Sequence, residues 1–260
     1  MPYKAFDLSG RVVVITGGNG GIGLGMAEGL CQARAEVCVW GSNADKNARA
    51  LEQLAEIGPR VTVQQCDIRS ESQVEACFAR TLADHGRVDG CFANAGVAGL
   101  GTRFEKTTID EWEEVIRVNQ TGVFFTFRAA ARHMKERAQQ GDAFGRLVGT
   151  SSLAANSGLP TGEHYAAAKG GMVAMIKALA TEYARYGVTA NAIMPGYVET
   201  DMTAVALGER VVIERILPRI PVRRWGKPED FAAIAIYIMS MASSYHTADT
   251  FLIDGGYSVF

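Results

Sequence analysis

The sequence lacks an excess of charge of either sign. Lys and Arg number 26 against 28 Asp and Glu, which leaves a formal net charge of −2. A chain that binds a nucleic-acid backbone needs a surplus of basic residues to neutralise phosphates. The charge balance therefore argues against nucleic acid as the main partner and leaves a small molecule as the expected one.

Cysteine and histidine are also scarce, and neither forms a motif. The five cysteines are odd in number and include no Cys-x-x-Cys pair, and the four histidines show no His-Glu-x-x-His spacing. These patterns argue against a disulfide framework and against a zinc site. We expect no bound metal and a reducing compartment, the cytoplasm.

Long hydrophobic runs are missing as well. The first ten residues lack the apolar stretch of a signal peptide, and the longest apolar segment, residues 231–242, is too short to cross a bilayer. The sequence thus predicts a protein without a membrane anchor.

Glycine is the residue present in excess, within an otherwise ordinary globular composition. There are 29 glycines among 260 residues, with 48% hydrophobic and 21% charged residues overall. The usual glycine content is roughly 7%. Much of this glycine must therefore serve backbone geometry.

Short β-branched runs alternate with helical patterns along the whole chain. Strands are expected at residues 11–16, 36–40, 61–65, 88–93, 146–150, 188–194 and 250–253. Helices are expected at residues 22–34, 44–57, 71–85, within 109–138, and at 165–186 and 229–241. Parallel strands need crossover connections, so this alternation predicts one α/β domain over residues 1–260. Its fold class is a Rossmann-type doubly wound parallel sheet of about seven strands with helices on both faces.

Residues 200–224 interrupt this rhythm between the sixth strand and the last helix. Ligands bind such sheets at the carboxyl ends of the strands. The segment is therefore either a lid over the substrate or an ordinary surface insertion.

A glycine-rich loop, Thr-Gly-Gly-Asn-Gly-Gly-Ile-Gly at residues 16–23, joins the first strand to the first helix. Glycines at this place permit a tight turn and let the backbone approach a pyrophosphate at the helix N-terminus. No Gly-Lys-Ser/Thr follows, which argues against a P-loop NTPase. A methyltransferase would share this opening and remains the rival interpretation.

The end of the second strand, where an adenine ribose would be read, carries no acid before Asp45. A carboxylate there would accept from both ribose hydroxyls and repel a 2′-phosphate. Ser42 and Asn43 can bond either form of the ribose, and Lys46 or Arg49 can reach a phosphate unless both are solvated charges of a helix face. The missing acid favours NADP slightly over NAD.

A tyrosine and a lysine four residues apart lie on a predicted helix. The spacing places Tyr165 and Lys169 on one helix face, where the ammonium would lower the pKa of the phenol. Ser152, just after the fifth strand, could share a substrate oxygen with that phenol. Any single Tyr-x-x-x-Lys can be a surface pair, but here three features converge on one edge of the sheet.

With these features the sequence resembles the short-chain dehydrogenase/reductase family, over residues 8–256. The glycine loop matches the family pattern, as do Asn-Ala-Gly after strand four and the Ser, Tyr and Lys set. The resemblance implies catalytic roles for Asn119, Ser152, Tyr165 and Lys169. The expected cofactor-binding residues are Gly17, Asn19, Gly21, Ile22, Gly23, Ser42, Asn43, Asp67, Ile68, Asn94, Ala95, Gly96, Tyr165, Lys169, Pro195, Gly196, Val198 and Thr200.

The resemblance also implies a division of labour. Tyr165 would be the general acid or base, Lys169 would lower its pKa and bind the nicotinamide ribose, and Ser152 would orient the substrate oxygen. Asn119 would hold a proton-relay water. The chain departs from the family's cofactor markers at Gly20, where NADP-preferring members carry a basic residue, and at Gly41, where NAD-preferring members carry Asp.

The expected activity is transfer of a hydride between NAD(P) and a ketone or secondary alcohol. The alternatives are reduction of a 3-oxoacyl thioester on a carrier protein and a catalytically silent dinucleotide-binding scaffold. A mostly apolar substrate pocket is expected from Leu153, Asn156, Leu159, His164, Tyr197 and residues 200–224.

Two groups of residues allow two interpretations each. Arg219, Arg223 and Arg224 would meet an acidic substrate or be solvated. Family members are commonly tetramers, so a homotetramer is expected. Its contacts would come from Phe124, Phe125, Phe127, Met172, Val173, Met175 and the apolar end at residues 256–260, unless these side chains belong to the internal core.

Overall fold

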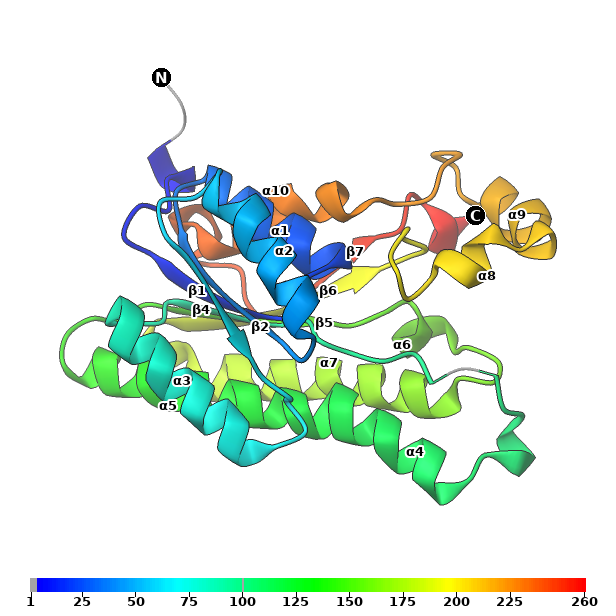
Figure 1. The fold of residues 1–260 in the computed structure, drawn as a ribbon, viewed down its shortest axis with the longest axis horizontal. Helices are drawn as coiled ribbons and strands as arrows, with labels where there is room; N and C mark the ends of the chain where they lie inside the picture. The colour runs from blue at the N-terminus through cyan, green and yellow to red at the C-terminus, as the bar shows by residue number, and fades with distance from the viewer. Residues whose placement is uncertain (1–3, 100) are drawn as a thin grey trace.

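Seven parallel strands form one sheet, in the order β3-β2-β1-β4-β5-β6-β7 (Figure 1). The computed structural model describes residues 4–99 and 101–260. The strands are β1 Val12–Thr16, β2 Glu36–Gly41, β3 Val61–Gln65, β4 Gly90–Ala93, β5 Gly145–Thr150, β6 Val188–Pro195 and β7 Thr250–Ile253. The chain order reverses between β1 and β4, which creates the crevice where ligands bind such sheets. The predicted fold class is confirmed.

Two layers of helices cover the two faces of the sheet (Figure 1). One layer holds α1 Gly21–Gln32, α2 Ala44–Ala55 and α10 Ala232–Met239, and the other holds α3 Glu71–His85, α5 Val123–Gln139 and α7 Glu163–Tyr183. Alternate strand residues enter the two cores: Val13 and Ile15 pack toward the first layer, Val14 toward the second. A sheet buried on both faces explains why its strands read as continuous apolar runs.

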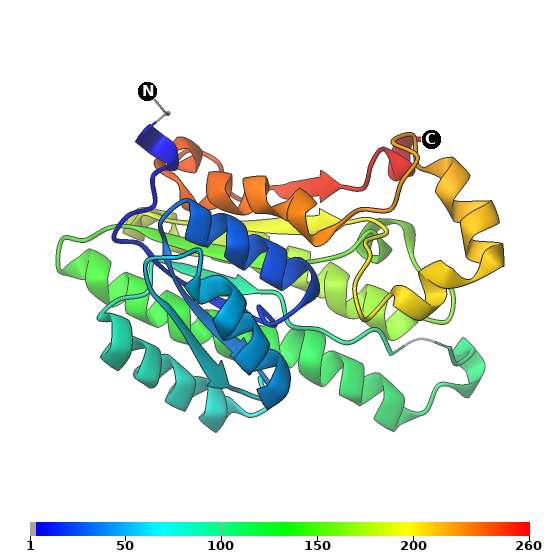
Figure 2. The ribbon, with the colours of Figure 1, turned by 45° about the horizontal axis from the view of Figure 1, so that its top comes forward.

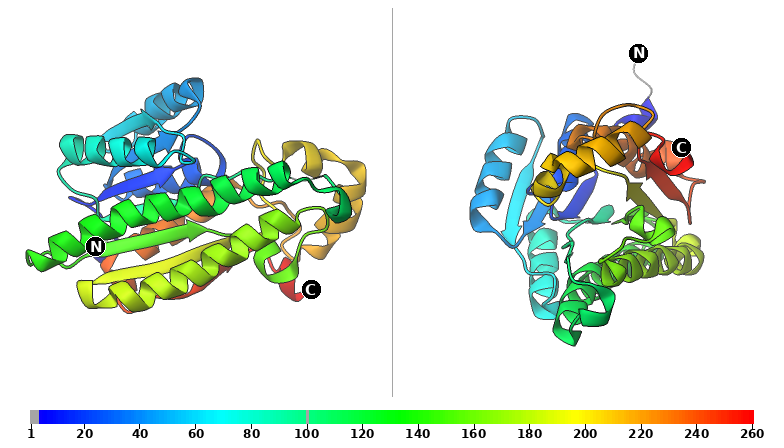
Figure 3. Two further views of the ribbon diagram at one scale, coloured as in Figure 1. Left: turned by 90° about the horizontal axis from the view of Figure 1, so that it is seen from below. Right: turned by 90° about the vertical axis from the view of Figure 1, so that its right-hand side faces the viewer.

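The long helix expected within residues 109–138 is interrupted. α4, Ile109–Ile116, passes into a π-helical segment, η3 Arg117–Gly122, before α5 begins. Figure 3 shows α4 and α5 continuing in one direction beside α7. π-helical turns inside α-helices are rare and often mark functional sites, and this one contains Asn119.

The segment that interrupts the rhythm folds into two short helices, α8 Ala204–Gly208 and α9 Arg210–Ile216, followed by the 3₁₀ turn η5 Leu217–Arg219. They lie beyond the carboxyl ends of the strands, where the arrow of β6 points (Figure 2). The last expected helix is shorter than predicted, because its first turn is the 3₁₀ segment η6 Pro228–Phe231.

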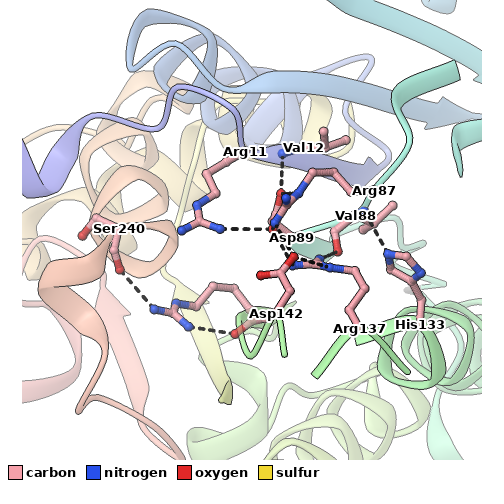
Figure 4. Close-up of polar contacts among 11 residues, drawn as sticks. Arg11, Val12, Arg87, Val88, Asp89, His133, Arg137, Asp142 and Ser240 are labelled. Carbon is pink, nitrogen blue, oxygen red and sulfur yellow. Dashed lines mark hydrogen bonds and ion pairs between the residues drawn. The ribbon is translucent and has the colours of Figure 1, made fainter. Parts of the chain in front are cut away.

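At the amino-terminal ends of the strands, a buried carboxylate joins several segments through hydrogen bonds (Figure 4). Asp89 is fully buried just before β4 and accepts hydrogen bonds from the backbone N–H of Val12 and from the guanidinium groups of Arg11, Arg87 and Arg137. Burial alone would raise the pKa of Asp89. The hydrogen bonds from Arg87 and Val12 and the charges of Arg137 and Arg87 hold that pKa below its usual value instead.

Two residues expected at a subunit contact lie in the internal core. Phe127 and Met172 are almost completely buried between the sheet and helices α5 and α7. Phe124 is 44% exposed on α5, while Phe125, Val173 and Met175 are half-buried. Among the described residues no helix combines the length and the apolar character needed to cross a membrane.

Candidate active site

One cleft of about 560 Å³ runs along the carboxyl ends of the strands. It is lined by all the predicted cofactor-binding residues except Gly23 and by the predicted catalytic residues except Asn119. Predicted residues from seven separate segments therefore meet in this cleft. Gly23 and Asn119 lie behind the wall, where each supports residues that line it.

The glycine loop turns sharply from β1 into α1. Gly17 and Gly21 adopt positive φ angles of 64° and 51°, which side chains disfavour. A Cβ on Gly23 would lie only 2.3 Å from the carbonyl oxygen of Gly17 and 2.4 Å from Nδ2 of Asn94. The loop can thus bring its backbone and the N-terminus of α1 to the cleft only with glycine at these positions.

Asn94 ties this loop to the neighbouring strands. Its Nδ2 lies 3.2 Å from the carbonyl oxygens of Thr16 and Gly17, and its Oδ1 accepts from Thr150 Oγ1 at 3.1 Å. One carboxamide therefore links β1, β4 and β5 at the edge where the cleft lies.

The end of β2 is covered by a pair of asparagines. Asn19 Nδ2 donates to Asn47 Oδ1 at 2.7 Å, and Asn47 Nδ2 donates to the carbonyl oxygen of Gly41 at 2.9 Å. A Cβ on Gly41 would lie 2.1 Å from Asn19 Nδ2. The place of the absent acid is thus filled by Asn19. The sequence did not reveal Asn47, whose role depends on contacts with two other segments; its only local signal is an amide in the first turn of a helix.

The residues after β2 are partly committed to local structure. Asn43 caps α2, because its Oδ1 accepts from the backbone N–H of Lys46 at 2.9 Å. Ser42 is exposed at the cleft. Asp67, after β3, is held by Arg69, whose Nε and Nη2 donate to it, and these bonds lower the pKa of Asp67.

Tyr165, Lys169 and Ser152 meet in the wall of the cleft at the ends of β5 and α7. The hydroxyl of Ser152 lies near enough to the phenol of Tyr165 to lower its pKa in part. Lys169 Nζ donates to the carbonyl oxygen of Thr150 at 2.7 Å and lies 5.6 Å from the centre of the Tyr165 ring. Local helix spacing and the position of Ser152 at a strand end explain this arrangement.

The ionisation of this set differs from the sequence-based expectation. Burial raises the pKa of Tyr165, and the nearby Ser152 hydroxyl offsets this rise only in part. Burial also lowers the pKa of Lys169 to about 8. The expected lowering of the pKa of Tyr165 by Lys169 is therefore not found; desolvation dominates, and the tyrosine is a neutral phenol at neutral pH.

Asn119 is fully buried in the π-helical turn. Its Oδ1 accepts from the backbone N–H of Val97 at 2.9 Å, and its Nδ2 donates to the carbonyl oxygen of Val97 at 2.8 Å. A Cβ on Gly96 would meet Asn119 Oδ1 at 2.7 Å and Lys169 Nζ at 3.4 Å. Asn119 thus holds the loop after β4 against the lysine. Its role with a relay water stays a prediction.

Five residues of the expected substrate pocket do not line this cleft, and the pocket itself stays a prediction. Within the part of the chain that the structure describes, the residues lining the cleft do not include Leu153, Asn156, Leu159, His164 or Tyr197. His164 is buried and stacks on Trp112, and Tyr197 packs against Trp225 and Tyr257. Neighbouring residues take the place of these side chains in the wall: Val97, Val118, Met202 and Thr203.

The three arginines of the 200–224 segment have intramolecular partners. Arg219 donates to the hydroxyl of Tyr257, Arg223 to the carbonyl oxygen of Pro218, and Arg224 to the carboxylate of Asp230. These contacts favour the interpretation of a solvated edge over that of a site for an acidic substrate.

Comparisons with known proteins place this geometry in a large group of relatives. The model of the family described as Enoyl-(Acyl carrier protein) reductase matches residues 17–258. A 3-oxoacyl-[acyl-carrier-protein] reductase of Chlamydia pneumoniae is 35% identical over 96% of this chain and 97% of its own. A 2-dehydro-3-deoxy-D-gluconate 5-dehydrogenase of Escherichia coli is 33% identical over 99% of each chain.

Solved structures agree with the fold. A short-chain type dehydrogenase/reductase from Mycobacterium marinum superposes with a TM-score of 0.91 at 30% identity over 99% of both chains. A gluconate 5-dehydrogenase from Burkholderia cenocepacia, in complex with NADP and tartrate, gives 0.92 at 31% over 99% of this chain and 98% of its own. A 3-ketoacyl-(acyl-carrier-protein) reductase from Brucella melitensis, complexed with NADH, gives 0.88 at 29% over 97% and 100%.

Proposed function

The chain belongs to the short-chain dehydrogenase/reductase family and is an NAD(P)-dependent oxidoreductase, and from this premise we propose that it is a carbonyl reductase or secondary-alcohol dehydrogenase with Tyr165 as its general acid and base. The observation that carries the proposal is that Ser152, Tyr165 and Lys169 line one wall of the same cleft. The glycine loop lies in the same cleft, so a dinucleotide bound there would extend toward these side chains.

The residues present fit a dinucleotide. The glycines leave the N-terminus of α1 open to a pyrophosphate, and the cleft extends from the ends of β2 and β3 to those of β5 and β6. The ends of β2 and β3 would hold the adenosine. The loop after β4, Lys169 and residues 195–200 would hold the nicotinamide and its ribose. NAD(P) supplies the hydride when bound.

The chain's own residues then handle the proton. As a buried phenol, Tyr165 donates its proton to the substrate oxygen during reduction and takes it back during oxidation. Ser152 bonds the same oxygen and orients it. Lys169, held by the carbonyl oxygen of Thr150, supplies a positive charge beside the phenolate that reduction leaves behind.

The proposed substrate is a small or medium ketone, or the matching secondary alcohol. A mixed wall of Val97, Val118, Met202 and Thr203 supports it. The last two belong to the 200–224 segment, which we propose as the substrate lid. Reduction of a 3-oxoacyl thioester is the second candidate, supported by the likeness to the Chlamydia pneumoniae enzyme. A silent scaffold is disfavoured, since such a protein has no use for Ser152, Tyr165 and Lys169 in one cleft wall.

The test is a side-by-side fluorescence titration with NADH and NADPH, followed by a substrate screen. The screen sets simple ketones and keto sugar acids against an acetoacetyl thioester, with oxidation of the dinucleotide as readout. We expect binding of at least one dinucleotide and turnover of a free ketone. Turnover restricted to thioesters would establish the second candidate, and a folded protein that binds neither dinucleotide would refute the dehydrogenase.

We also propose a homotetramer in the cytoplasm. Exposed apolar side chains on α5 and at the chain end support the assembly: Phe124, Val259 and Phe260 are 44%, 85% and 68% exposed. All five cysteines are free thiols and buried, as suits a reducing compartment. A stable monomer in light scattering at micromolar concentration would refute the assembly.

A further inference from the structure

An ion pair joins the two sides of the cleft near the adenosine end. Lys46 Nζ, in the first turn of α2, lies 2.6 Å from Oδ2 of Asp201, at the start of the lid segment. The two residues are 155 positions apart in the chain, and both line the cleft. The contact therefore does not arise from local helix geometry.

The lid residue beside this pair packs directly on the glycine loop. A Cβ on Gly21 would lie 3.0 Å from Cγ2 of Thr200. Thr200 Oγ1 is hydrogen-bonded to Thr203 Oγ1 at 3.1 Å. This contact links Thr200 to the start of α8. Asp201 is thus presented to Lys46 by a segment anchored over the loop that would hold the pyrophosphate.

Lys46 favours the charged form of Asp201. The hydrogen bond and the charge of Lys46 lower the pKa of Asp201, and the charge of Arg49 adds to this effect. The carboxylate is therefore an anion at neutral pH, held against the cation of the ribose-reading segment.

Lys46 is the cation that we expect a 2′-phosphate to meet, because it lines the cleft whereas Arg49 does not. It follows β2 by five residues and shares the cleft wall with Ser42 and Asn43. No acid at position 41 repels a phosphate there, and Asn19 covers that position. A 2′-phosphate would thus have to displace Asp201 from Lys46 or lie beside a second anion, whereas a ribose with two free hydroxyls would not.

We propose that Asp201 is a specificity-determining residue, which competes with the 2′-phosphate for Lys46 and shifts dinucleotide preference from NADPH toward NADH. The inference rests on the proposed function, since it concerns the dinucleotide of that same site. It places part of the cofactor selection on the lid rather than on the strand end.

The test measures dissociation constants for NADH and NADPH with the full-length protein and with Asp201→Asn at low ionic strength. We expect NADPH affinity to rise about threefold to fivefold, the size of an exposed ion-pair effect, while NADH affinity changes by less than twofold. The difference should shrink at 0.5 M salt, because exposed charges are screened.

Asp45→Asn is the matched control. It removes an equal charge from the first turn of the same helix, where Asp45 is exposed. If this variant shifts the ratio of the two affinities as much as Asp201→Asn does, the effect is that of overall charge and the inference is wrong. Equal gains for NADH and NADPH in Asp201→Asn would also overturn it, since they would reveal a lid that merely hinders entry.

A double-mutant cycle completes the test. Lys46→Gln should lower NADPH affinity, and adding Asp201→Asn in that background should change the ratio no further. An undiminished effect of Asp201→Asn without Lys46 contradicts the competition. Failure of the wild-type protein to bind either dinucleotide would instead refute the proposed function and remove this inference with it.

Discussion

Burial moves the proton affinities of the tyrosine and the lysine on α7 toward their neutral forms. The pKa of Tyr165 is raised and that of Lys169 is lowered to about 8. Below pH 8 the lysine keeps its charge while the tyrosine keeps its proton. In the proposed reaction, Tyr165 therefore carries at neutral pH the proton that a carbonyl oxygen would receive.

Tyr165→Phe should remove this proton donor and little else, since the ring still fills its place. Turnover should fall by about 10² to 10⁴, while NADH and NADPH affinities change by less than twofold. Steady-state rates and a fluorescence titration on the same preparation measure both. Retention of a tenth of the turnover would mean that another group carries the proton.

Lys169→Met should stabilise the dinucleotide-free protein at neutral pH. The lowered pKa means that the folded state disfavours the charged lysine, and this cost is largest below pH 8 and vanishes as pH rises toward the unfolded value of about 10.4. The gain should be about 2 kcal/mol at pH 7, after loss of the bond to Thr150, and should shrink by pH 10. Urea unfolding at both pH values checks the sign, and a gain that grows with pH would contradict it.

At the scale of elements, the glycine loop, the π-helical turn and the loop after β4 support one another. Asn94 bonds the loop, Asn119 bonds Val97, and Gly96 leaves room between Asn119 and Lys169. Each contact joins segments that are distant in the chain. These contacts hold the wall of the cleft together around Lys169.

Gly23→Ala should disrupt this assembly, because its Cβ would collide with Gly17 and Asn94. We expect a loss of about 1–3 kcal/mol in stability together with loss of dinucleotide binding. Gly20→Ala is the control for stability, since its φ of 179° is extended and its Cβ would meet no atom within 4 Å. Equal melting temperatures for the two variants would show that the loop relaxes freely.

Sequence patterns predicted the elements better than the contacts between them. Strand alternation located all seven strands, because a doubly buried parallel sheet leaves a direct apolar signature. The Asn19–Asn47 pair and the set of residues that line the cleft depend on distant segments, and no local pattern announces the π-helical turn. The family resemblance named Asn119 but not the π-helical turn around it, and His164 faces Trp112 where the pattern suggested substrate.

In the whole molecule, the two ends of the strands have different roles. The carboxyl ends form the cleft, and the amino ends are joined by Asp89 and its arginines (Figure 4). Arg11 and Arg146 also stack on the ring of Phe144, at 3.7 and 4.1 Å from its centre. The residues of the candidate active site and the contacts expected to stabilise the fold thus lie at opposite ends of the strands.

Asp89→Asn should be among the most destabilising single changes in the chain. It leaves Arg11, Arg87 and Arg137 without their shared counter-charge, at an expected loss of about 3–5 kcal/mol. Asp84→Asn, which breaks an exposed pair with Arg80, should leave the unfolding midpoint unchanged. Comparable midpoints for the two variants in urea would refute the role of Asp89.

The lowered pKa of Asp89 also predicts how the stability of the protein depends on pH. Because the pKa of Asp89 is lower in the folded state than its unfolded value of about 3.9, its contribution is fully present above that pH and is lost as pH falls through the folded value. The loss of stability between pH 4 and pH 2 should therefore be smaller in Asp89→Asn than in the wild type. An identical acid response would contradict this.

The ion pairs of Asp89 at the amino ends of the strands also affect which substitutions such a protein tolerates during evolution. α8 and α9 lie beyond the carboxyl ends of the strands, away from Asp89 and its arginines at the amino ends, so substitutions there leave these ion pairs intact. If the 200–224 segment is the substrate lid that we propose, substitutions in it would change substrate preference while the ion pairs of Asp89 still stabilise the sheet. Its relatives include a sugar-acid dehydrogenase and an acyl-carrier-protein reductase, and such a range of substrates is what this arrangement predicts.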